Sequence, residues 1–250
     1  AETRQRFPGL RLGFHVAYNI WTTNEPDKLF PDSRVLASNG RHDWYAQPAW
    51  WLSDARRAQG WAIYPYYPTL TNSFGKALIG SVDAMVDGIG ADMVWADGLL
   101  GGYGAEMGDY PTGYVRTLEP WDGHSVELDP ASKTITRKYG LIVDLGKEAL
   151  IEYIRRCTAK GCRVWINHGI PVPRSFAPLE AYWCCETMDG NQRIAALHLV
   201  PGAPHALHTP GKPLTAQGVY DEMRGKLSWG AMYVPFWIRG ASQLTHPLIT

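Results

Sequence analysis

Two carboxylates stand where short apolar runs of the sequence end. Asp97 ends the run Met-Val-Trp-Ala-Asp and is followed at once by glycine, and Glu186 ends Tyr-Trp-Cys-Cys-Glu. Two acids from different strand ends suit glycoside hydrolysis, in which one acid protonates the leaving oxygen and the other attacks the sugar carbon or activates water. We therefore predict Asp97 and Glu186 as the catalytic pair. The alternatives are a turn capped by Asp97 and a surface salt bridge of Glu186.

Asp189 lies three residues beyond Glu186 and competes for the same role, although Asp189 and Gly190 together are typical of a turn.

Polar and aromatic side chains recur at other strand ends and in one long loop. The chain holds 11 Trp and 13 Tyr, and flat rings with polar tips suit stacking against sugar faces. The predicted sugar contacts are His15, Tyr18, Tyr64, Tyr66, Tyr67, Trp95, Asn167 and His168 at strand ends, with Asp122 and His124 in the loop. Each has a structural alternative as a satisfied core or turn residue, and Asp122 with Gly123 equally indicates a turn.

Metal and cofactor motifs are missing from the sequence. It has no Cys-x-x-Cys pair and no His-x-His, so we predict neither a metal nor a cofactor. Two rival functions remain open. One is a metal-dependent barrel hydrolase that uses His15, Asp97, His168 and Glu186, and the other is a carbohydrate-binding barrel without catalysis.

The 4 cysteines leave the redox compartment open. Cys184 and Cys185 are adjacent, so on a strand their side chains point to opposite faces and do not bridge. Cys157 and Cys162 could approach each other, or they are two small buried apolar residues.

The elements that must position these residues alternate between strands and helices. Near-continuous apolar runs predict buried parallel strands at 10–16, 61–67, 91–96, 161–167, 181–185 and 229–236. A weaker candidate at 194–200 equally suits a short helix. Because no glycine-rich phosphate turn follows the first strand, a barrel is favoured over an open doubly wound sheet. The 250 residues also match one barrel. The predicted fold is an α/β (β/α)8 TIM-like barrel, either incomplete or part of a longer chain.

Helices are predicted between the strands. Apolar residues recur at helical spacing over 78–89 and 150–157, with Gly90 and Gly161 as stops, and a third helix is predicted from Thr215 as N-cap to Leu227. Long loops at about 18–50 and 99–140 interrupt a single domain over 1–250, and the second contains a hairpin that turns at Asp129 and Pro130.

Charge and hydropathy exclude several partner classes. Lys plus Arg and Asp plus Glu are 24 each, which predicts neither a nucleic acid nor an anionic membrane as partner. The opening AETRQRFPGL lacks the basic and apolar regions of a signal peptide. We expect a secreted or periplasmic protein if a leader has been removed, and a cytoplasmic one otherwise. Oligomeric state is left open.

Two segments resemble known catalytic strand ends. Val-Trp-Ala-Asp-Gly and Trp-Cys-Cys-Glu-Thr look like those of barrel glycoside hydrolases, in the style of the retaining α-galactosidase-like and endo-α-N-acetylgalactosaminidase-like groups. The likeness covers 61–236 as architecture, but as sequence only those segments. It implies that Asp97 is the nucleophile, that Glu186 is the general acid/base, and that the anomeric configuration is retained.

Overall fold

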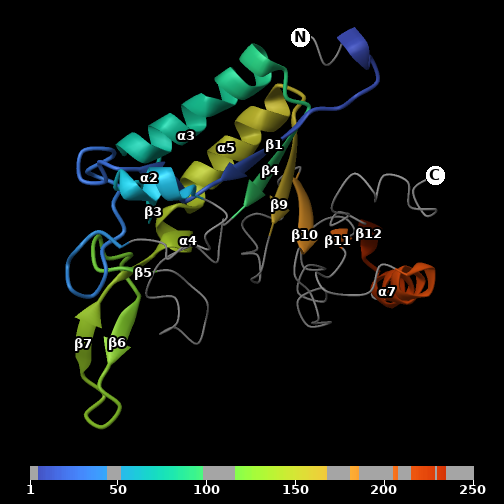
Figure 1. Ribbon diagram of the computed structural model, residues 1–250. Coiled ribbons are helices and arrows are strands. Elements are labelled where there is room, and N and C mark those ends of the chain that lie inside the picture. The colour runs from blue at the N-terminus through green and yellow to red at the C-terminus, as the bar shows by residue number, and fades with distance from the viewer. Residues whose placement is uncertain are drawn as a thin grey trace. The chain divides into compact units, whose positions relative to one another are not determined.

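The computed structural model describes residues 5–43, 52–97, 116–167, 181–185, 205–207, 215–228 and 230–234 (Figure 1). The chain divides into two compact units, Ala1–Val164 and Trp165–Thr250. The single domain over 1–250 stays a prediction.

The first unit is built on parallel strands. Strand β1 (Gly13–Ala17) pairs in parallel with β4 (Met93–Asp97), with His15 opposite Trp95 and Ala17 opposite Asp97. Strand β9 (Arg163–Asn167) begins in the last two residues of this unit, and its remaining residues belong to the second. The three central residues of β4 are all buried, as expected for a parallel strand covered on both faces. The strands predicted at 10–16, 91–96 and 161–167 are confirmed within a few residues.

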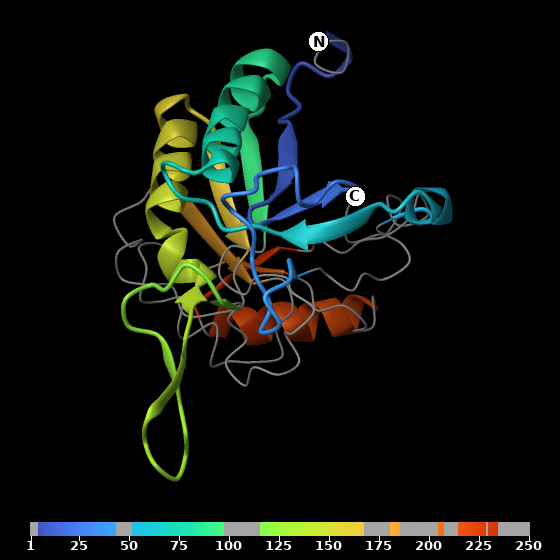
Figure 2. The same ribbon diagram turned by 90° about the vertical axis from the view of Figure 1, so that its left-hand side faces the viewer.

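Two helices cover this sheet side by side (Figures 1 and 2). Helix α3 (Ser73–Asp83) continues into a π-helical turn, η1 (Ala84–Ile89), and α5 is Lys147–Ala159. Both predicted stops are confirmed, since Gly90 and Gly161 have φ of 79° and 75°, a region that favours glycine. The helices bury apolar stripes and are joined on their outer sides by Asp83, whose Oδ1 lies 3.1 Å from Lys160 Nζ.

The prediction of a parallel strand at 61–67 is wrong. Strand β3 (Ala62–Pro65) pairs antiparallel with β2 (Ile20–Thr23) in a separate two-stranded ribbon. The chain leaves β1 through a short turn and runs directly into β2, so β3 meets a strand of opposite direction. Burial alternates along β3, and Ile63 packs with Ile20 and Leu52 in a small core cluster. Helix α2 (Asp54–Ala58) precedes this strand.

The segment after β4, which was predicted as a long loop at about 99–140, contains short strands and is followed by a short helix. These elements are β5 (Arg116–Thr117), β6 (Val126–Leu128), β7 (Ile135–Lys138), β8 (Gly140–Leu141) and α4 (Ile142–Leu145). The hairpin of β6 and β7 projects from the first unit (Figures 1 and 2). Its predicted turn is confirmed, because Asp129 Oδ1 accepts hydrogen bonds from the backbone N–H groups of Ala131 and Ser132 at 2.9 and 2.6 Å.

The second unit also carries parallel strands. Strands β10 (Ala181–Cys185), β11 (His205–Leu207) and β12 (Met232–Val234) pair in parallel, and α7 is Ala216–Ser228. The sequence predicted β10, β12 and α7, whose N-cap Thr215 accepts a hydrogen bond from the Gly218 N–H at 3.0 Å. It missed β11, and the candidate at 194–200 lies outside the described residues.

The structure is thus a mixed α/β fold with a parallel sheet. Among the described residues, no helix combines the length and the apolar character that crossing a bilayer would need.

Candidate active site

The carboxyl ends of β1 and β4 bring two predicted site residues together. His15 Nε2 lies 3.1 Å from Asp97 Oδ2, although the residues are 82 positions apart. The parallel register is the cause, because it sets Ala17 opposite Asp97 and leaves His15 two positions earlier on the same face. The Asp97 side chain is 14% exposed and that of His15 is 57% exposed, so the pair is accessible at the strand end.

Trp95 lies on the same face of β4 as Asp97, opposite His15. It is buried, with a relative exposure of 7%. The structure therefore places three of the predicted residues, namely His15, Trp95 and Asp97, on one face of two adjacent parallel strands.

Tyr18 fixes the main chain beside this pair, but its ring belongs to the core. Its backbone N–H donates to the carbonyl oxygen of Asp97 at 2.9 Å. Its hydroxyl donates to the carbonyl oxygen of Gly146 at 3.3 Å, and its ring packs edge-on against Tyr153. Burial raises the pKa of Tyr18 well above its usual value. The side chain is enclosed, so the structural alternative describes its position better than a sugar contact does.

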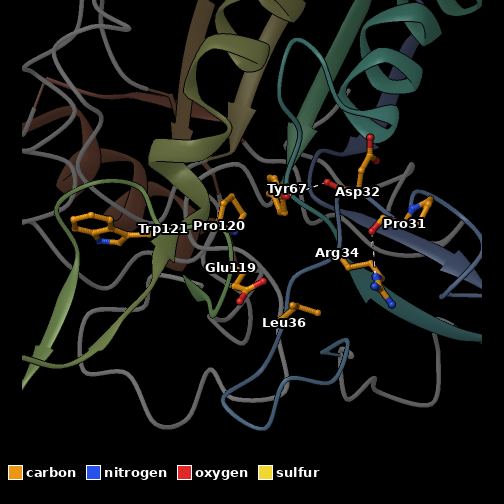
Figure 3. Close-up of a pocket in the computed structure, with 8 residues that line it drawn as sticks. All are labelled: Pro31, Asp32, Arg34, Leu36, Tyr67, Glu119, Pro120 and Trp121. Carbon is orange, nitrogen blue, oxygen red and sulfur yellow. Dashed lines mark hydrogen bonds between the residues drawn. The ribbon is translucent and has the colours of Figure 1, made fainter.

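The three tyrosines in and after β3 have different surroundings. Tyr64 is half-buried beside His42, and the two ring centroids are 5.0 Å apart. Tyr66 is fully buried, and this burial raises its pKa. Tyr67 donates its hydroxyl hydrogen to the carbonyl oxygen of Asp32 at 2.9 Å and borders a cavity (Figure 3).

The other residues that line this cavity were not selected from the sequence. They are Pro31, Asp32, Arg34, Leu36, Glu119, Pro120 and Trp121. The sequence feature that could have pointed to this cavity was the tryptophan of Trp-Asp-Gly-His. We selected only the Asp and His of that segment.

Asp122 organises its own loop. Its side chain is 2% exposed, and its carboxylate accepts hydrogen bonds from the backbone N–H groups of His124, Ser125 and Leu141 at 3.0, 2.8 and 3.0 Å. Burial opposes the charged form, but these bonds outweigh it and hold the pKa of Asp122 at about 2. These hydrogen bonds favour the turn, which the sequence left open as the alternative to a sugar contact.

His124 lies between two acids. Its Nε2 is 3.3 Å from Asp144 Oδ2, and its Nδ1 is 3.7 Å from Asp122 Oδ1. One potential ligand atom from each residue lies within 4.8 Å of the others. The two acids face different ring nitrogens, so they hold the imidazole between them rather than converge with one nitrogen on a common ion.

Three predicted residues cannot be placed in the same way. Asn167 is the last residue of β9. His168 and Glu186 lie outside the described residues. In the sequence, Glu186 directly follows Cys185, the last residue of β10.

Comparison with known proteins gives little further information. No protein-family model and no curated protein matches the chain. Among solved structures, the chain is similar to Old Yellow Enzyme from Pichia sp. AKU4542, with 11% identity and a TM-score of 0.38. The match covers 64% of this chain and 42% of that chain.

Proposed function

We propose that the chain is a barrel glycoside hydrolase that cleaves O-glycosidic bonds in an oligo- or polysaccharide, with Asp97 as its first catalytic carboxylate. The observation that supports this is the accessible Asp97–His15 pair at the carboxyl ends of two parallel strands. Active sites of parallel α/β barrels lie at that edge, where side chains from several strand ends converge. The proposal includes closure of the sheet into a barrel.

In the proposed mechanism, Asp97 attacks the anomeric carbon and forms a covalent glycosyl ester. Glu186 donates a proton to the departing glycosidic oxygen, then takes a proton from the water that hydrolyses the ester. His15 is a positioning residue, because an N–H at 3.1 Å from Asp97 Oδ2 orients the carboxylate. A separation of about 5 to 5.5 Å between the two carboxyl groups is the geometry of this retaining route, and about 6.5 to 9.5 Å that of inversion.

Replacing Asp97 with asparagine tests the proposal. Wild type is first screened against aryl glycosides and polysaccharides, and the anomeric configuration of the first product is read by NMR. We expect Asp97→Asn to lower kcat by on the order of a thousandfold or more, with the far-ultraviolet circular dichroism unchanged. The matched control is Asp92→Asn, since Asp92 stands just before β4 at the opposite end of the strand. An Asp97→Asn variant as active as wild type would remove Asp97 from the mechanism.

A metal-dependent hydrolase is the second candidate, because 3.1 Å between His15 Nε2 and Asp97 Oδ2 also suits two ligands of one ion. A third ligand would have to come from outside the described residues. Metal analysis of the purified protein, with activity before and after chelation, separates the two mechanisms. Glycan binding without any cleavage would instead favour the non-catalytic carbohydrate-binding barrel.

A further inference from the structure

Two cysteines meet where α5 ends and β9 begins. The Cys162 N–H donates to the Cys157 carbonyl oxygen at 3.0 Å, and the Gly161 N–H donates to the Thr158 carbonyl oxygen at 2.9 Å. Gly161 has a φ of 75°. These are the bonds of a Schellman C-cap, in which the side chains at the positions of Cys157 and Cys162 are commonly in contact. The backbone of the helix end therefore holds the two side chains against each other.

The two thiols also interact directly. A hydrogen bond from the Cys157 thiol lowers the pKa of Cys162, and the same bond, together with burial, raises the pKa of Cys157. The two residues are 0% and 1% exposed, and both are free cysteines in this structure. Tyr153, one turn before Cys157 on the same face of α5, is buried as well. Two sulfur atoms in contact on a fixed backbone need only a short further approach to become bonded.

We propose that Cys157 and Cys162 form a disulfide bond, which ties the last turns of α5 to the residue that precedes β9. The alternative is packing alone, since small apolar side chains also fill this contact at helix ends. The bond is favoured because any apolar pair would fill the contact, whereas this chain has a thiol at both positions and the two thiols hydrogen-bond to each other. A disulfide here implies that the protein matures in an oxidising compartment, because such bonds are rare in the cytosol.

The oxidation is a thiol–disulfide exchange, with a small disulfide such as oxidised glutathione as the oxidant. The Cys162 thiolate attacks one sulfur of the oxidant and displaces one glutathione thiolate. The Cys157 sulfur then attacks Cys162 Sγ in the mixed disulfide and displaces the second. The protein loses two electrons and two protons, and the oxidant takes up both pairs to become two molecules of glutathione. Because both thiols are buried, the exchange takes place during folding, before the helix end closes.

Tryptic mapping tests the bond directly. Trypsin cuts after Arg156, Lys160 and Arg163. Cys157 and Cys162 therefore fall on two separate short peptides, Cys-Thr-Ala-Lys and Gly-Cys-Arg. The reduced full chain is refolded in a glutathione redox buffer, its free thiols are alkylated, and the denatured protein is digested and analysed by mass spectrometry without reduction. We expect the two peptides to be joined to each other in most of the protein and to separate on reduction.

Melting temperatures measure what the bond does for the fold. The oxidised protein should melt about 4 °C or more above the same protein after reduction. This difference should vanish in the Cys157→Ala/Cys162→Ala double variant. The matched control is the Cys184→Ala/Cys185→Ala double variant, which removes the other two cysteines and should keep the difference.

A parallel refolding in urea separates pairing directed by the fold from pairing by chance. The bond should survive at least about tenfold more reduced glutathione in the folded protein than in the chain kept unfolded, because a bond that stabilises the fold is stabilised by it to the same extent. Equal survival in the two states overturns the proposal. So do free thiols at both positions after refolding, or peptides that join Cys157 or Cys162 to Cys184 or Cys185. Should the Cys157→Ala/Cys162→Ala variant fail to fold, the peptide map and the urea comparison of the wild-type chain decide.

Discussion

Replacing Asp122 with asparagine should destabilise the protein, because the Asp122 carboxylate accepts three backbone hydrogen bonds that asparagine cannot all accept. The carboxylate accepts from His124 and Ser125 through Oδ1 and from Leu141 through Oδ2. An asparagine has one acceptor oxygen where aspartate has two. Its side-chain NH2 group would therefore point at one of the backbone N–H groups, so that two hydrogen-bond donors face each other without an acceptor. The side chain is only 2% exposed, and water cannot easily repair the mismatch.

The pKa of Asp122 sets the size of this effect. A fall from the usual 3.8 to about 2 in the folded protein is worth about 2.4 kcal/mol, at about 1.36 kcal/mol for each pKa unit. Because the folded pKa is the lower one, this stabilisation is complete above the unfolded pKa. It is lost as the pH falls from about 4 toward 2. We therefore expect Asp122→Asn to lower the free energy of unfolding by about 2 kcal/mol at pH 7.

Urea unfolding followed by tryptophan fluorescence, at pH 7 and at steps down to pH 2.5, measures both the loss and its pH dependence. The control is Asp129→Asn, because Asp129 also accepts two backbone N–H bonds but lies in the exposed hairpin turn, where the loss should be smaller. Equal stability of Asp122→Asn and wild type at pH 7 would refute the reasoning. A deficit that does not shrink in acid would also refute it.

Two other predictions concern packing. Gly75→Ala should cost about 3 kcal/mol or more, because its Cβ would lie 1.7 Å from the Thr69 carbonyl oxygen, whereas Gly80→Ala in the same helix meets nothing within 4 Å and should gain up to about 1 kcal/mol. Thermal unfolding of both variants checks this pair, and equal melting temperatures would contradict it. Tyr18→Phe should lower the free energy of unfolding by about 1 kcal/mol, because it removes the hydrogen bond to the Gly146 carbonyl oxygen. Its KM should equal that of wild type. A raised KM would show that Tyr18 contacts the substrate.

Local pattern predicted most of the elements. The apolar runs at β4 and β10 and the glycine stops of the two long helices are properties of neighbouring residues, so they can be read from one segment at a time. The pairing of β3 cannot, because an apolar run does not reveal the direction of its partner. Strand β11 was missed because His205–Leu207 stands between proline and histidine residues and belongs to no apolar run.

The site was predictable only in part for the same reason. That Asp97 ends a buried strand follows from its own segment, whereas its contact with His15 depends on the register of two distant strands. Asp122 shows the opposite case, since an acid before glycine suits both a turn and a binding loop, and only the three N–H contacts favour the turn. The cavity beside Tyr67 joins segments that share no motif.

The long sequence separation within the strand-end pair also has a kinetic consequence. His15 leaves the ribosome well before Asp97, which lies 82 positions later, so a nascent chain holds half of the pair for as long as that stretch takes to synthesise. Closing a segment of this length costs chain entropy before the contact can form. Substitutions that slow the docking of the first strand would thus lower the yield of competent molecules during synthesis, while the molecules that do mature would be indistinguishable from wild type.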